Sequence, residues 1–191
     1  MATQKGVDKW KAKEWLSVQA PKLFNEAVVG EMPVNEGKLA VGRNMVVSLD
    51  YLTHNPSHAF TNVVLKVTDV SGATAHTRML SMEQVASYVR SFVRRYRSVS
   101  SAIVPVVAKD GTSIVVKLII VTTRRTATSK IKGLRQEAEI FTRNYFKENE
   151  FTNAVNAVIE GKFQAELTNH LSNIVDLNKV EVRKLEVEQS A

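Results

Sequence analysis

Cysteine is absent from the 191 residues of this chain, which excludes disulfide bonds, thiolate zinc sites and cysteine nucleophiles and is typical of a reducing, intracellular setting. No stretch of about eighteen apolar residues occurs either, so we expect no membrane-spanning helix. The N-terminus is charged where a secretory signal peptide needs an apolar run. These absences favour a cytoplasmic protein without a membrane partner.

The usual signatures of enzymes are missing as well. The chain holds no H-E-x-x-H, no G-x-S-x-G and no phosphate-loop pattern. Its histidines form no coherent set of ligands, because Asn55-Pro56 interrupts the helical spacing between His54 and His58. We therefore expect no catalytic residue, no metal site and no cofactor.

A hydrophobic fraction of 44% is enough for a sizeable core. We expect a flexible basic head at residues 1–12, because Trp10 is its one large apolar side chain and the segment cannot bury enough surface to order itself. Residues 13–191 are expected to form a single domain that is rich in strands over 13–121 and in helices over 122–191.

Alternation of apolar and polar residues predicts the strands of the first part. Single strands are expected at Glu14–Ala20 and Arg43–Leu52, with a loop at 30–42 between them. The pairs Ser71-Gly72 and Asp110-Gly111 each predict a tight hairpin turn. The hairpin strands are Phe60–Val70 with Ala73–Leu80, and Ile103–Ala108 with Ser113–Val121. Because only Lys117 interrupts the apolar run Ile114–Val121, we expect a central strand covered on both faces.

Helical periodicity predicts about four helices, three of them in the second part of the chain. They are expected at Glu83–Tyr96, Ser129–Lys147, Glu150–Ile159 and Lys162–Ile174. A last strand is expected at Lys179–Glu188, and a phase change between Val182 and Leu185 predicts a β-bulge. Strands followed by helices favour an α+β fold, with a mixed or antiparallel sheet, or a partly closed barrel, built from hairpins.

The net charge of +7 is distributed very unevenly along the chain. Residues 86–143 carry twelve Lys and Arg against three acids, and residues 1–25 carry five against two. The segments 26–85 and 144–191 are acidic, with balances of −2 and −3. A field of one sign that is confined to part of a surface attracts a polyanion, and the obvious polyanion is nucleic acid.

The first candidate contact is the helix expected at Glu83–Tyr96. Its apolar face is predicted to hold Val85, Val89, Phe92 and Tyr96. Its arginines are expected on the other side, as a stripe of Arg90, Arg94 and Arg97 with Arg95 at the seam. Arginine suits phosphate because its planar fork donates two hydrogen bonds to one anion. The alternative is a solvated face, although such faces usually mix charges of both signs.

The second candidate is the segment Thr122–Lys132, in which Arg124 and Arg125 leave the central strand and Lys130 and Lys132 follow at a helix start. Unpaired backbone N–H groups at a helix start, beside hydroxyls and cations, form an anion site. Ordinary capping by Thr128 or Ser129 is the alternative, and the two are compatible.

The third candidate is the head, in which lysines alternate around two tryptophans. The lysines are Lys5, Lys9, Lys11 and Lys13. Aromatic rings among cations suit stacking on bases with neutralisation of phosphate beside them. We expect Trp10 to make such a contact and Trp15 to pack into the core.

Taken together, several segments resemble the small-subunit ribosomal protein family that archaea and eukaryotes share, the S-three-Ae or S-one-e family. The segments are DKWKAKEWLSVQAP at 8–21, VGE at 29–31, GR at 42–43, a strand ending in SLDYLT, LKVTDVSGATAHT at 65–77, SYVRSFVRR at 87–95 and TRRTATSKIKGLRQEA at 123–138. The resemblance spans about Lys9 to Glu188, and the length suits the archaeal form. Glu14 lies within the otherwise basic head motif and does not fit a contact made by lysines alone.

The resemblance implies a structural constituent of the small ribosomal subunit with no enzymatic activity. Its partners would be the ribosomal RNA of the platform, near the messenger exit and the RNA 3′ end, neighbouring platform proteins and messenger RNA. The matching positions imply RNA contacts at Lys9, Trp10, Lys11, Lys13, Arg90, Arg94, Arg95, Arg124, Arg125 and Lys130. The residues alone leave open a free RNA-binding regulator or chaperone and, more remotely, an enzyme of RNA metabolism.

Overall fold

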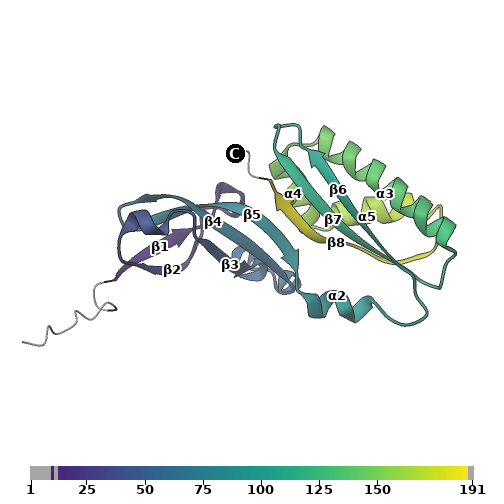
Figure 1. Ribbon diagram of the computed structural model, residues 1–191, viewed down its shortest axis with the longest axis horizontal. Coiled ribbons are helices and arrows are strands. Elements are labelled where there is room, and N and C mark those ends of the chain that lie inside the picture. The colour runs from purple at the N-terminus through teal and green to yellow at the C-terminus, as the bar shows by residue number, and fades with distance from the viewer. Residues whose placement is uncertain (1–9, 11–12, 189–191) are drawn as a thin grey trace, which may run out of the picture.

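The computed structural model describes Trp10 and residues 13–188, and residues 1–9, 11–12 and 189–191 lie outside the described part. The flexible head expected at residues 1–12 is, apart from Trp10, outside it too. The molecule is elongated and has two halves along its long axis (Figure 1). One half consists mainly of strands, and in the other half helices are layered on a sheet.

The N-terminal half contains five strands: β1 (Glu14–Gln19), β2 (Val28–Val34), β3 (Asn44–Ser48), β4 (Thr61–Ser71) and β5 (Thr74–Gln84). A short helix, α1 (Leu49–Thr53), follows β3. The 3-10 turns are η1 (Lys22–Phe24), η2 (Gly37–Ala40) and η3 (Pro56–His58). The predicted hairpin of β4 and β5 is confirmed, and Gly72 in its turn has φ 60°, which glycine adopts without strain.

The C-terminal half contains three strands: β6 (Val99–Val107), β7 (Ser113–Thr122) and β8 (Leu177–Val187). Its helices are α2 (Ala86–Phe92), α3 (Thr128–Glu148), α4 (Phe151–Ile159) and α5 (Lys162–Leu171). The hairpin of β6 and β7 is confirmed, with Gly111 at φ 79° in the turn. The bulge in the last strand is also confirmed, because Lys184 and Val182 of β8 pair with successive residues of β7 and leave Arg183 unpaired.

All eight strands in the described part belong to one open sheet with the order β2-β1-β5-β8-β7-β6, to which β4 and β3 add on the β5 side. β5 joins the two halves, because its start pairs in parallel with β1 and its end pairs antiparallel with β8. The α+β fold with a mixed sheet is therefore confirmed. Of the two architectures expected, the open sheet forms and the partly closed barrel does not.

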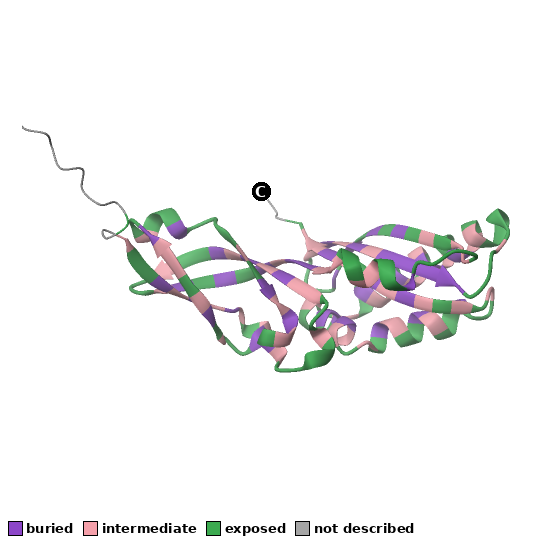
Figure 2. Cartoon of the chain, turned by 90° about the horizontal axis from the view of Figure 1, so that it is seen from below, coloured by how far each residue is buried: buried purple, intermediate pink, exposed green. Residues whose placement is uncertain are grey.

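The main core lies between the C-terminal sheet and the helices that cover one of its faces. α3 buries Leu134, Ala138 and Phe146, and α5 buries Phe163 and Leu167 against the strands. Figure 2 shows this buried layer between strands and helices. Burial of each large side chain contributes about 1.5–3 kcal/mol. The packing fixes α3 across β6 and thereby places its first turn at the end of β7.

The opposite face of the sheet is covered only in part. Near the end of β7, Ile119 and Val121 are buried under Phe92 of α2. Val115 and Lys117 lie on the same face nearer the start of β7 and remain half-exposed. The expectation that this central strand is covered on both faces along its whole length is therefore wrong, because α2 is too short to reach beyond the end of β7.

Two predicted boundaries near the N-terminus are wrong. The expected loop at 30–42 contains most of β2, which pairs antiparallel with β1. Its Pro33 weakened the sequence signal, but β2 is an edge strand and can tolerate a missing N–H donor. The strand expected to reach Leu52 ends at Ser48, because the chain turns into α1 and buries Leu52 there instead.

Candidate nucleic-acid interface

The loop between β7 and α3 carries the paired arginines, and its backbone is held in place by Thr122. The Thr122 hydroxyl donates a hydrogen bond to the carbonyl of Arg124 at 2.6 Å and accepts one from the backbone N–H of Ser98 at 3.0 Å. The backbone N–H of Thr123 donates to the carbonyl of Asp176 at 3.0 Å. Two contacts with other elements therefore fix the loop, while the side chains of Arg124 and Arg125 stay exposed.

A polar hollow of about 490 Å³ lies beside this loop. Arg124, Arg125 and Lys130 line it together, and Asp176 is the one acidic residue in its described lining. Lys132 does not line it, because it is two residues beyond Lys130 and about 200° farther around α3. The structure thus brings three of the four predicted cations of this segment to one place.

The first turn of α3 opens toward the same region. Its N-cap is Ala127, whose side chain can accept no hydrogen bond, so the alternative of ordinary capping by Thr128 or Ser129 is wrong. The first backbone N–H groups of a helix have no partner within the helix and carry its positive dipole end. Together with the cations of the hollow, they suit an anion such as a phosphate.

The arginine helix is shorter than predicted. β5 continues to Gln84, and α2 covers only Ala86–Phe92. At Val93 the backbone leaves the helical region, with φ −81° and ψ 97°. Of the predicted stripe, only Arg90 lies on the helix, and the other arginines lie in the loop before β6: Arg94, Arg95 and Arg97. The single helical stripe is therefore wrong.

The arginines of this loop have different surroundings. Arg97 donates from Nη1 to the side-chain oxygen of Asn178 at 2.7 Å and to the carbonyl of Phe92 at 3.3 Å, so it fastens the loop to β8. Arg94 bonds through Nε to the carbonyl of Ser91. The side chains of Arg90 and Arg95 are exposed and have no hydrogen bond or ion pair with the described residues.

Ser98 connects the two basic loops, although they are far apart in sequence. Besides its bonds with Thr122, its hydroxyl accepts a hydrogen bond from the backbone N–H of Thr126 at 3.0 Å. The exposed cations of the two loops therefore belong to one end of the C-terminal sheet. We call these loop arginines, together with Lys130 at the start of α3, the basic corner, which comprises Arg94, Arg95, Arg124, Arg125 and Lys130.

A half-buried cation holds α2 against the sheet beside the basic corner. Lys179 of β8 donates to the Tyr88 hydroxyl at 2.6 Å, and its amine lies 5.1 Å from the centre of the Phe92 ring. Burial lowers the pKa of Lys179, but the hydrogen bond to Tyr88 and the attraction of Glu181 outweigh it, so the pKa is raised overall. This lysine stays charged and serves the fold, and the loop after α2 starts from a fixed point.

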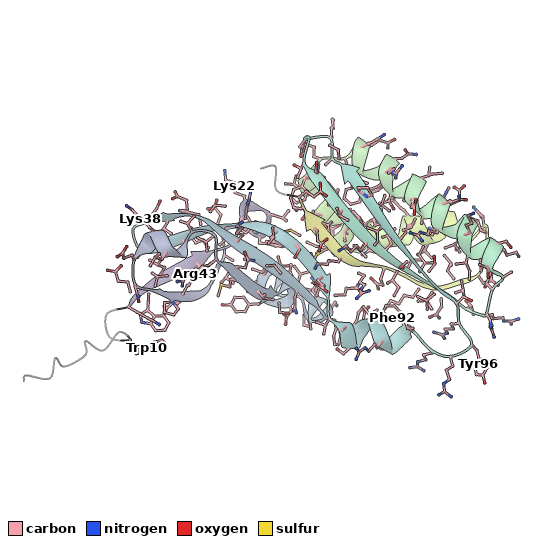
Figure 3. All side chains as sticks on the ribbon, in the orientation of Figure 1. Trp10, Lys22, Lys38, Arg43, Phe92 and Tyr96 are labelled. Atoms are coloured by element: carbon pink, nitrogen blue, oxygen red, sulfur yellow. The ribbon has the colours of Figure 1, made fainter. Side chains whose placement is uncertain are left out.

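Tyr96 is a candidate site residue that the sequence analysis did not identify. The sequence placed it on the apolar helix face, whereas the structure places it in the loop with 88% of its surface exposed. Figure 3 shows it at the end of the molecule that also holds the basic corner. Its position directly after Arg94 and Arg95 could have indicated a contact with nucleic acid. The spacing of Tyr96 from Phe92 instead fitted the apolar face of a helix.

Trp10 lies toward the opposite end of the long axis (Figure 3). The Lys13 amine lies 4.3 Å from the centre of the Trp10 ring, and the rings of Trp10 and Trp15 meet edge to face with centroids 6.2 Å apart. Trp15 is 54% exposed, so its expected packing into the core is wrong. The remaining predicted contacts of the head lie outside the described residues: Lys5, Lys9 and Lys11.

A rigid basic corner and an exposed aromatic pair are typical of proteins that bind nucleic acid through their surface. Within residues 13–188 and Trp10, no group of three or more His, Asp or Glu side chains could hold a metal ion. None of the described helices is long and apolar enough to cross a membrane.

Comparison with known proteins assigns the family. The sequence model of the Ribosomal S3Ae family matches residues 1–191. Archaeal proteins named small ribosomal subunit protein eS1 are similar over most of their length. That of Sulfolobus acidocaldarius is 34% identical over 93% of this chain and 90% of its own, and that of Methanothermobacter thermautotrophicus is 31% identical over 94% and 92%. That of Haloarcula marismortui is 28% identical over 92% and 83%. The chain therefore belongs to the ribosomal S3Ae family and is a structural ribosomal protein rather than an enzyme.

Proposed function

We propose that this protein is a structural constituent of the small ribosomal subunit that binds ribosomal RNA at the platform, near the messenger exit and the RNA 3′ end, during translation in the cytoplasm. Membership of a ribosomal family over the whole chain is the observation that carries the proposal. The archaeal relatives are named as small-subunit proteins. The basic corner supports RNA as the ligand, because it exposes four arginines from two loops and Lys130 from the start of α3 on one rigid support.

The two ends of the molecule serve different parts of this function. In the basic corner, Arg124, Arg125 and Lys130 share one hollow and fix the position of an RNA backbone. At the other end, Trp10 and Lys13 belong to the lysine-rich head, which adds contacts by stacking and by neutralising phosphate. A protein that touches RNA at both ends can tie separate RNA segments together, as a structural constituent does.

Neighbouring platform proteins and messenger RNA near the exit are the further partners in this proposal. The N-terminal half exposes several large apolar side chains, among them Val28, Leu39 and Val46. The C-terminal half also exposes apolar side chains, among them Val99, Ile103 and Val107, and such side chains on either half suit contact with another protein.

Sedimentation of small subunits through a high-salt wash tests the proposal. A constituent should co-migrate with the subunit, because its many contacts release it slowly, whereas a free regulator or chaperone should be washed off. Crosslinks from Lys13 should map to small-subunit RNA near its 3′ end. Release by the wash, or crosslinks that reach only protein or distant RNA, would contradict the proposal.

A further inference from the structure

Tyr96 combines an unusual backbone with an unusual exposure. Its φ is +64°, a left-handed conformation that a bulky residue rarely adopts. It occupies a two-residue turn with Arg95, a kind of position that glycine or asparagine usually takes. Its ring is 88% exposed and has no aromatic contact with the described residues. The fold therefore gains no packing from this side chain. A glycine at this position, which has no side chain, would relieve the backbone strain.

The loop that presents Tyr96 is held at both ends. On the α2 side, Phe92 is buried against Ile119 and Val121, and its carbonyl accepts a hydrogen bond from Arg97. On the β6 side, Ser98 is fixed to the loop after β7 by its bonds with Thr122 and Thr126. Five residues lie between these two anchors. Tyr96 thus projects from a loop whose ends cannot move apart, so the part of the loop that carries the ring is already in place before any ligand binds.

Charge around the ring points to the class of ligand. Arg94 and Arg95 precede Tyr96, and the Ser98 bridge brings the exposed Arg124 and Arg125 to the same end of the sheet. An exposed ring among cations suits a nucleotide, because the ring stacks on the base while the cations neutralise the phosphates beside it. A ring can reach the flat face of a base only where that base has left the helical stack, since side chains on a duplex meet its backbone and groove edges.

We propose that Tyr96 is a stacking platform for one unpaired RNA base, so that the basic corner recognises a bulged, looped-out or single-stranded nucleotide. The ligand class is a nucleotide with a free base face and flanking phosphates. This inference rests on the proposed function, because it takes RNA as the ligand, and it adds which kind of RNA element the basic corner selects.

The test compares Tyr96→Ala and Tyr96→Phe with the unaltered full-length protein. The probes are a short single-stranded RNA that carries one 2-aminopurine and a blunt RNA duplex of the same length. Tyr96→Ala should weaken binding of the single strand about 5- to 150-fold, the factor that corresponds to one stacked base. It should also abolish the quenching of 2-aminopurine fluorescence. The salt dependence and the affinity for the duplex should not change, because no cation is lost. Tyr96→Phe should keep both the affinity and the quenching.

Tyr96→Gly provides a second variant, in which a loss of RNA binding cannot result from backbone strain. It should raise the melting temperature, because glycine takes a positive φ freely, and yet it should lose the single strand as Tyr96→Ala does. Unchanged single-strand affinity and quenching in Tyr96→Ala would overturn the inference. Loss of subunit incorporation with unchanged RNA binding would also overturn it, since Tyr96 would then contact a protein. Neither result would contradict the proposed function. The proposed function is contradicted instead if the high-salt wash removes the unaltered protein from the subunit.

Discussion

Replacing Arg124 and Arg125 together by Gln tests whether the basic corner binds phosphate. Both side chains are exposed, line the hollow beside α3 and have no hydrogen bond or ion pair with the described residues. Each is therefore free to neutralise one phosphate. The fold should survive, because surface substitutions away from caps and networks usually change stability by less than about 0.5 kcal/mol.

The expected effect is on the salt dependence of RNA binding. Each lost phosphate contact lowers the slope of log affinity against log salt by about 0.7 for single strands and about 0.9 for duplex DNA. Two lost contacts lower it by about 1.4–1.8. When the salt concentration is raised from about 50 to 200 mM, both proteins lose affinity. The factor by which the variant's affinity falls should be about 7 to 12 times smaller than the factor for the unaltered protein.

Fluorescence anisotropy with a labelled single-stranded RNA measures this slope. A matched control, Arg143→Gln with Lys147→Gln, removes the same charge from exposed positions on α3. These positions lie about 20 to 26 Å beyond Lys130 along the helix. The control should keep nearly the whole slope. Equal losses in both variants would mean that RNA binding follows net charge alone, and an unchanged slope in Arg124→Gln with Arg125→Gln would mean that the hollow does not bind phosphate.

Three further results are expected. Removing residues 1–12 should weaken incorporation into the subunit without lowering the melting temperature, because the core begins at Leu16; a large drop in melting temperature would refute this. Leu134→Ala should destabilise the protein by about 2–5 kcal/mol in denaturant unfolding, because Leu134 is 1% exposed, and the RNA salt slope should stay the same while the protein is folded. Hydrogen bonds from Lys117 and then Lys184 hold the pKa of Glu186 below its usual 4.5, so its contribution to stability is present above pH 4.5 and is lost as the pH falls through the lowered pKa. The stability difference between the unaltered protein and Glu186→Gln should therefore shrink in acid, and a difference that stays constant down to low pH would contradict this assignment.

Local signals predicted the parts of the fold that depend on local physics. Gly72 and Gly111 both take a positive φ in hairpin turns, and the length and type of such a turn fix the register of the strands that flank it. The regular spacing of Leu134 and Ala138 identified α3, because one apolar stripe is enough to bury a long helix against a sheet. The bulge at Arg183 was visible as a phase change, since strand periodicity is strict.

Contacts between distant segments decided the parts that were predicted wrongly. The spacing of Phe92 and Tyr96 fits a helix, but Arg97 bonds to Asn178 on β8, and the chain must leave the helix early to enter β6. Trp15 alternates in phase with polar residues of β1, so its large ring lies on the outer face of the strand while Leu16 enters the core. No local pattern reveals a partner 81 residues away, nor the bonds of Ser98 with Thr122 and Thr126, 24 and 28 residues away, that group the two basic loops. Their role in RNA binding stays a prediction.

The separation of the cationic groups determines how their contributions combine. Within the basic corner, Arg95 and Arg125 sit on loops that share Ser98, so a change in one loop can shift the other and their effects need not add. Trp10 and Lys13 lie toward the other end of the long axis and share no described contact with the corner. Losses of salt slope at the two ends should therefore add. The affinities should not combine in this simple way, because an RNA already held at one end meets the other end at a raised effective concentration. An RNA too short to span the molecule should bind the basic corner with the same affinity whether or not the head is present, whereas a longer one should lose affinity when residues 1–12 are removed.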